Sequence, residues 1–122
     1  MKFVGLLLKE SLIDESVLDA VRIAKVETWN VDNAASFQPA VWTAVYFEGD
    51  ERQADVIAEK LSRSLKPAWY CNISTESHSY VIFPTKVFKY PRGDQPKRAE
   101  AQEYGRSLGI PDRQLDWGES FP

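Results

Sequence analysis

Residues 41–65 read VWTAVYFEGDERQADVIAEKLSRSL, a strand pattern followed at once by a helix pattern. Residues 41–48 carry apolar side chains on both alternating faces, which is typical of a strand inside a sheet. Gly49 ends this strand, and Asp50 is a residue type that caps helices. Apolar residues then recur at helical spacing, which predicts a helix with one buried stripe that Pro67 ends. The rest of the predicted fold is arranged around this strand and helix.

Upstream of this unit, the sequence predicts two more strands and a short helix. Residues 3–8 are apolar on both alternating faces, so they predict a second internal strand. Asp14 is placed to cap a short helix that extends to Val21. Residues 23–31 alternate as a strand does, with Trp29 on one side.

Downstream, residues 68–74 and 79–90 read as a hairpin. Pro84 interrupts the second of these strands, which predicts an edge position or a bulge at that point. Asp94 opens a final helix, and Gly109 suits the left-handed position that closes it. The tail follows, and we expect three apolar residues to anchor it: Leu115, Trp117 and Phe121.

The order of elements predicts one α+β domain spanning residues 1–122. Strand, short helix, strand, strand, helix and strand make a repeated split β-α-β unit, the ferredoxin-like pattern, here with an extra C-terminal strand and helix. In that topology the first and third strands lie in the middle of the sheet. Those are residues 3–8 and 41–48, the two segments that are apolar on both faces.

A ferredoxin-like sheet carries its paired helices on one face, so the other face needs a different cover. Trp42, Tyr46 and Trp29 would line that other face, and large apolar patches usually mark an interface or a groove. The cover could be the last helix with Trp117, a second copy of the chain, or a ligand. We favour the chain's own tail together with a homodimer. The leading functional hypothesis is a non-catalytic module that binds a small molecule or a protein through this aromatic face and the hairpin around Trp69 and Tyr70.

Composition excludes several classes of site and partner. The chain has 122 residues, 15 basic and 18 acidic side chains, and a formal net charge of −3, which argues against a nucleic-acid surface over the whole domain. Cys71 is the single cysteine and His78 the single histidine, so the sequence predicts no internal disulfide and no metal site. A lone thiol fits a reducing compartment, and the apolar N-terminal run is too short for a membrane span. We therefore expect a cytoplasmic protein.

An alternative function is a small enzyme with a groove over the sheet that uses Cys71 or His78. If the hairpin has a two-residue loop, Cys71 faces Tyr80 and lies diagonal to His78 on the same face of the sheet. A thiol beside an imidazole could be activated as a nucleophile. The competing interpretation is a small buried cysteine and a solvated histidine near the turn.

A second alternative is a nucleotide or nucleic-acid site on the basic residues Lys86, Lys89 and Arg92, which alternate with Phe88 and Tyr90. The competing interpretation is an edge strand whose lysines prevent unwanted pairing. The sequence contains no glycine-rich phosphate loop and no catalytic serine or zinc motif of the known kinds, and it predicts no cofactor.

Two segments resemble a family of small bacterial proteins of unassigned function. They are WYCNISTESHSYVIFPTKVFK at residues 69–89 and YGRSLGIPDRQLDW at residues 104–117. The resemblance extends over most of the chain and implies a bacterial, cytoplasmic protein. It assigns no activity and no catalytic residues.

Overall fold

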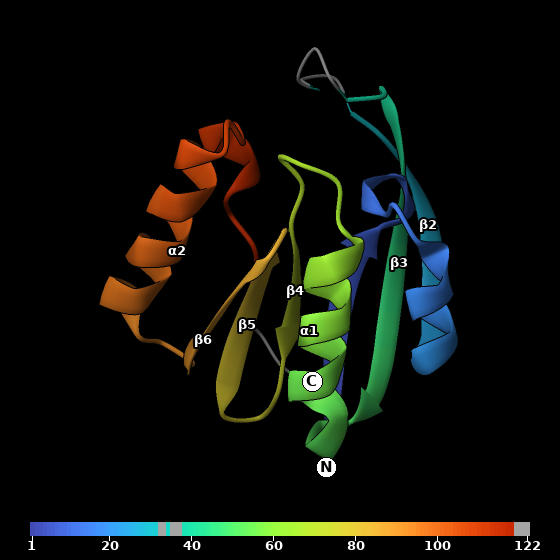
Figure 1. The fold of residues 1–122 in the computed structure, drawn as a ribbon, viewed down its shortest axis with the longest axis vertical. Coiled ribbons are helices and arrows are strands. Elements are labelled where there is room, and N and C mark those ends of the chain that lie inside the picture. The colour runs from blue at the N-terminus through green and yellow to red at the C-terminus, as the bar shows by residue number, and fades with distance from the viewer. Residues whose placement is uncertain (32–33, 35–37, 119–122) are drawn as a thin grey trace.

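The computed structural model describes residues 1–31, 34 and 38–118. Its six strands form one antiparallel sheet in the order β2-β3-β1-β4-β5-β6 (Figure 1). The strands are β1 (Lys2–Leu8), β2 (Arg22–Asn30), β3 (Val41–Asp50), β4 (Cys71–Ser74), β5 (His78–Phe83) and β6 (Lys86–Pro91). β1 pairs with β3 and β4, and β3 pairs with β2 and β1. The two strands predicted to be internal are therefore internal, and the predicted α+β class is confirmed.

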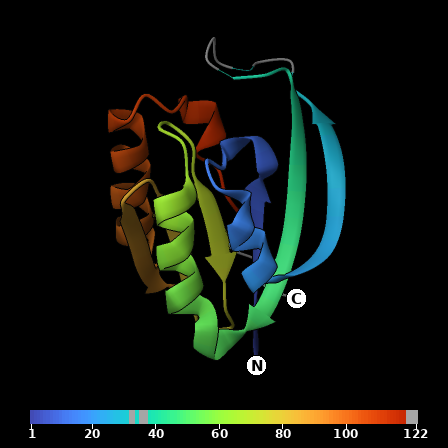
Figure 2. The same ribbon diagram turned by 45° about the vertical axis from the view of Figure 1, so that its right-hand side comes forward.

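The helices lie on both faces of this sheet. They are α1 (Ala54–Ser64), α2 (Gln95–Ser107) and the 3-10 turns η1 (Lys9–Ser11), η2 (Glu15–Ala20), η3 (Glu51–Gln53) and η4 (Asp112–Gln114). α1 and η2 cover one face, called here the α1 face, and α2 lies on the opposite face (Figures 1 and 2). Among the described residues, no helix combines the length and the apolar character needed to cross a bilayer.

Three aspartates begin helical segments, as predicted. The side chains of Asp14, Asp50 and Asp94 each accept a hydrogen bond from a backbone N–H two or three residues further along the chain. Two details differ from the prediction. Asp50 caps η3, which leads into α1, and the segment after Asp14 is a 3-10 helix.

Each face of the sheet has its own hydrophobic core. On the α1 face, α1 packs against β1, β3, β4 and β5, with Phe3, Phe47 and Leu61 almost completely buried. On the opposite face, α2 packs over β5 and β6, where Phe83 and Ala101 are buried. Because α2 covers this end of the sheet, the part formed by β1, β3 and β2 stays open on the same face.

The segment predicted as one strand over residues 79–90 is two strands. Pro84 and Thr85 form a tight turn, and Phe83 pairs with Lys86 across it. Proline fixes its own φ and has no N–H for a ladder, and Thr85 takes a φ of 62°, so the chain reverses instead of bulging. The sheet therefore has two extra C-terminal strands where one was expected.

The end of α2 follows the predicted pattern. Gly109 has a φ of 86°, and the N–H of Ile110 donates to the carbonyl of Gly105 at 3.2 Å, which closes the helix in a Schellman motif. Leu115 and Trp117 are buried and anchor the tail as expected. Phe121, the third predicted anchor, lies outside the described residues.

Candidate functional site

A groove of about 1090 Å³ lies on the open part of the sheet, on the face opposite α1. Its floor comes from β1 and β3. On β1, the apolar residues Val4, Leu6 and Leu8 are half-buried. β2 lines one side, and the segment 110–118 after α2 lines the other. The groove exists because α2 packs over β5 and β6 and leaves the other half of this face uncovered.

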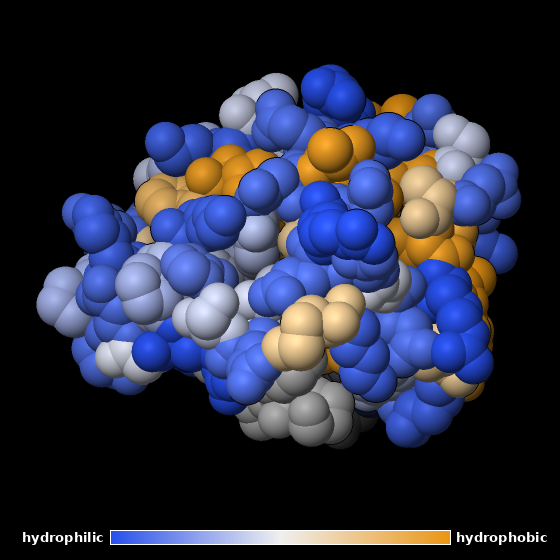
Figure 3. All heavy atoms as spheres, turned by 90° about the horizontal axis from the view of Figure 1, so that it is seen from below, coloured by the Kyte–Doolittle hydropathy of each residue, from blue (hydrophilic) through white to orange (hydrophobic). Residues whose placement is uncertain are grey.

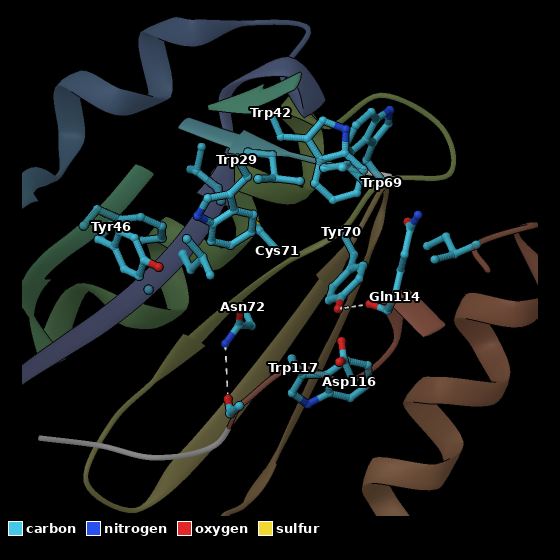
Figure 4. Close-up of a pocket in the computed structure, with 18 of the residues that line it drawn as sticks. Trp29, Trp42, Tyr46, Trp69, Tyr70, Cys71, Asn72, Gln114, Asp116 and Trp117 are labelled. Atoms are coloured by element: carbon cyan, nitrogen blue, oxygen red, sulfur yellow. Dashed lines mark hydrogen bonds between the residues drawn. The ribbon is translucent and has the colours of Figure 1, made fainter. Parts of the chain in front are cut away.

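All four tryptophans of the chain line this groove (Figure 4). Trp29 comes from β2 and Trp42 from β3, and the two are direct cross-strand partners. Trp69 precedes β4, and its ring meets the Trp42 ring edge to face at a centroid distance of 5.5 Å. Trp117 follows η4 and makes the same kind of contact with Tyr70, also at 5.5 Å. Four separate segments of the chain thus bring indole rings to one surface.

Hydrogen bonds hold the C-terminal side of the groove in place. The side-chain amides of Gln38 and Gln114 donate to each other at 3.0 and 2.9 Å. The hydroxyl of Tyr70 donates to the backbone carbonyl of Gln114, and the amide of Asn72 reaches the carbonyl of Gly118 at 3.5 Å (Figure 4). These contacts tie the segment 114–118 to β4 and to the residues before β3, so the groove has a fixed wall.

The groove lining carries few charges. Among the described lining residues the charged ones are Glu48, Arg113 and Asp116. The Glu48 carboxylate is paired with Arg22 and, at 3.5 Å, with Lys2. Arg113 also has an interaction of its own. The remaining polar groups of the lining are neutral, mainly the amides of Asn, Gln and the backbone, so the groove offers hydrogen bonds without a strong net field.

Tyr46 lies beside Trp29 in the groove and has an altered acidity. Burial and a hydrogen bond to the Glu27 carboxylate both raise the pKa of Tyr46, because each disfavours the phenolate. The Lys25 ammonium sits over the Tyr46 ring, 4.7 Å from its centroid. Lys25 and Glu27 of β2 and Tyr46 of β3 therefore form a tyrosine–carboxylate–lysine cluster at this side of the groove.

We expect Tyr46 to deprotonate at a higher pH than an unperturbed tyrosine, and we expect Glu27→Gln to bring its pKa down. The substitution removes the negative charge that opposes formation of the phenolate. The pKa is read from an ultraviolet absorbance titration, with Tyr46→Phe identifying the contribution of this residue. A Tyr46 pKa that is the same in the wild type and in the Glu27→Gln variant would show that the carboxylate has no part in the shift.

The proposed pairing of Cys71 with His78 does not form. The hairpin has four residues between Ser74 and Ser79, because the Thr75 hydroxyl accepts hydrogen bonds from two backbone N–H groups of the turn. Cys71 consequently faces Ile82 instead of Tyr80, which moves it two residues further from His78 along the hairpin. The Cys71 thiol belongs to the core on the α1 face, and burial raises its pKa.

Cys71 borders the groove although its side chain belongs to the core on the α1 face, whereas Tyr80 and His78 do not line the groove. The Tyr80 hydroxyl donates to the Asp55 carboxylate at 2.7 Å on the α1 face, and Lys89 binds the same carboxylate oxygen at 3.1 Å. The His78 imidazole contacts the Ser77 hydroxyl at 2.8 Å in the exposed turn. The three catalytic candidates are therefore not assembled around one cavity.

The basic residues of β6 do not converge on one surface either. Lys86 is paired with Phe83 and lies on the α2 face, whereas Lys89 is paired with Tyr80 and lies on the α1 face. The Arg92 guanidinium donates to the carbonyl of Glu76 at 2.9 Å. Alternation along the strand therefore places the two lysines on opposite faces of the sheet and not on one surface.

Sequence reasoning found the aromatic part of the groove and missed its polar wall. Five predicted binding residues line it together: Trp29, Trp42, Tyr46, Trp69 and Tyr70. Polar lining residues that were not predicted to bind a ligand include Gln38, Asn72, Gln114 and Asp116. The feature of the sequence that indicated contact between the C-terminal segment and the sheet was the large aromatic residue Trp117 in the tail.

Among residues 1–31, 34 and 38–118, no group of three or more histidine, cysteine, aspartate or glutamate side chains is placed to hold a metal ion. No protein-family model, curated protein or solved structure matches the chain.

Proposed function

We propose that this protein is a non-catalytic binding module whose groove takes an uncharged molecule that contains flat rings. The observation that carries the proposal is the convergence of all four tryptophans, from four segments of the chain, on one cavity. Indole rings bury large areas and lose little conformational freedom, so they make strong contacts with a planar or ring-shaped ligand. A volume of about 1090 Å³ is slightly above the range of about 300–1,000 Å³ that is usual for small-molecule sites, and it accommodates a ligand of several rings.

The charge distribution supports an uncharged ligand. Glu48 is already paired with Arg22 and Lys2, and Arg113 has its own interaction, so the described lining offers no spare cation to neutralise an anionic ligand. The neutral amides of Asn72 and Gln114 can give orientation through hydrogen bonds. Burying an unpaired ligand charge against the apolar floor of β1 would carry a large desolvation cost.

The reactive side chains favour binding over catalysis. The Cys71 thiol points into the core on the α1 face, and Tyr80 and His78 are bonded to partners outside the groove. The alternative of an enzyme with a groove over the sheet would need another acid or base there. Asp116 lines the groove but lies on its exposed C-terminal side.

The strand order also supports a ferredoxin-like origin for the first four strands. β2-β3-β1-β4, all antiparallel and with β1 and β3 internal, is the order of a split β-α-β repeat. We propose this topology, with η2 in place of the first α-helix and with β5, β6 and α2 added. The single buried thiol is consistent with the cytoplasmic location that we propose.

Binding is tested with the uncharged fluorescent dye N-phenyl-naphthylamine, whose emission rises in apolar surroundings. We expect saturable binding of one dye per chain, and quenching or transfer from the tryptophans, because all four line the site. Leu6→Trp fills the groove floor and should weaken dye binding about tenfold or more. Val56→Trp adds the same side chain at an exposed position on α1 and should bind as the wild type does.

Equal binding by the two variants, or no saturable binding by the wild type, would contradict the proposal. The anionic dye anilinonaphthalene sulfonate provides a second comparison. We expect it to bind more weakly than the uncharged dye, since Arg113, the one cation among the described lining residues, already has an interaction of its own.

A further inference from the structure

We propose that two copies of this chain associate through the outer edges of β2, in an antiparallel arrangement around a two-fold axis that passes by Val26. The two sheets would then join into one continuous sheet. This interface uses the outer edge of β2, whose Ala24 and Trp29 also line the groove. Dimer formation and dye binding are measured separately, so a monomeric protein would leave the proposed binding function untouched.

The outer edge of β2 is long and open. β2 is the first strand in the sheet order, and no other described strand pairs with its outer side. Two of its apolar side chains are unusually exposed, Ile23 at 46% and Val26 at 55%. Figure 3 shows apolar residues gathered along this flank of the molecule, on the side where β2 lies in Figure 1. An exposed strand edge with apolar side chains is a template for pairing with another strand.

The charges on β2 favour a second copy as the partner. Lys25 and Glu27 flank Val26. They lie on the same face of the sheet, because Lys25 pairs with Tyr46 and Glu27 pairs with Ala44. Antiparallel pairing centred on Val26 sets Lys25 of each copy opposite Glu27 of the other, and sets the two Val26 residues side by side. The edge is therefore complementary to itself in charge and in shape. Within one chain, Lys25 and Glu27 now pair with each other at 3.2 Å.

The other sheet edge lacks this property. β6 carries Lys86 and Lys89 without an acidic residue and ends at Pro91, features that discourage pairing. β2 also carries a bulge between Ile23 and Lys25, so the segment that can pair regularly and symmetrically around Val26 is residues 25–27. A ladder of this length buries little surface, and the expected dimer is weak and concentration-dependent.

Sedimentation equilibrium over a range from about 10 μM to about 1 mM tests the association. The wild type should pass from monomer to dimer. Lys25→Glu places like charges opposite each other across the axis, and Glu27→Lys does the same with the opposite sign, so each variant alone should dimerise about tenfold more weakly. An equimolar mixture of the two variants restores opposite charges across the interface and should recover dimer formation. The pair within each chain stays broken in that mixture, so recovery must come from contact between chains.

A second pair of variants tests the apolar centre of the interface. Val26→Lys brings two ammonium groups together at the axis and should abolish the dimer, while Val56→Lys, at a position on α1 that is exposed to a similar extent, should not. Circular dichroism confirms that each variant is folded. A wild type that stays monomeric, folded single variants that dimerise normally, or a mixture that does not recover would each overturn the proposal.

Discussion

Trp42→Ala is expected to lower the free energy of unfolding by about 3–5 kcal/mol. Trp42 is 8% exposed, packs edge to face on Trp69, and donates its indole N–H to the carbonyl of Pro39 at 2.8 Å. Alanine removes the ring from the end of the groove where these two indoles meet, and the flanking sheet cannot collapse to fill the space. Urea denaturation followed by far-ultraviolet circular dichroism measures the loss without relying on tryptophan emission.

Trp29→Ala is the matched control for this prediction. Trp29 is the cross-strand partner of Trp42, but it is half-buried at the edge strand, so its removal leaves no enclosed cavity. We expect a clearly smaller loss of stability together with weaker dye binding. If the two substitutions cost the same stability, Trp42 is not the structural support of the groove.

Gly5→Ala is expected to destabilise the protein by about 3 kcal/mol. A Cβ at Gly5 would lie 2.3 Å from the Cζ atom of Phe47 and 2.9 Å from the backbone oxygen of Asn72. Phe47 is 1% exposed in the core on the α1 face, and the Asn72 carbonyl belongs to the neighbouring strand, so neither can yield easily. The glycine allows β1 to pass under the Phe47 ring in the middle of the sheet.

Chemical denaturation of three variants tests this explanation. Gly118→Ala meets no atom within 4 Å and should change stability by about 0.5 kcal/mol or less. Phe47→Leu removes the aromatic ring that the added methyl group would strike, so Gly5→Ala should cost less in that background than in the wild type. Additive costs in the double variant would show that Phe47 is not the residue that requires glycine at position 5.

The internal strands were predictable because a strand that is buried on both faces carries apolar residues at consecutive positions. Residues 3–8 and 41–48 are apolar on both faces, and β1 and β3 indeed have neighbours on both sides. The same alternation places Trp42 and Tyr46 on one face of β3, so the aromatic surface could be expected before its cover was known. A capping aspartate at Asp94 and a closing glycine at Gly109 marked α2 in the same way.

The register of the hairpin and the cover of the second face depend on contacts that no local pattern encodes. The Thr75 hydroxyl lengthens the turn by bonding to its backbone, which moves Cys71 from Tyr80 to Ile82. Pro84 permits either a bulge or a reversal, and the positive φ of Thr85 gives the reversal. The wall of the groove depends on an amide pair between Gln38 and Gln114, residues far apart in the chain and without a distinguishing pattern around them.

The central claim is that ligands enter the cavity that the four tryptophans surround, and their indole N–H resonances report on it directly. The Nε1–H of Trp42 donates to the carbonyl of Pro39. The Nε1–H of Trp117 donates to the Tyr90 hydroxyl at 3.0 Å. The Nε1–H of Trp29 lies 3.4 Å from the Glu27 carboxylate. A titration with N-phenyl-naphthylamine, followed by two-dimensional nitrogen–proton correlation spectra, should shift the Trp29 indole signal first and leave the backbone signals of α1 in place. Saturable binding that moves the α1 signals and none of the four indole signals would contradict the account.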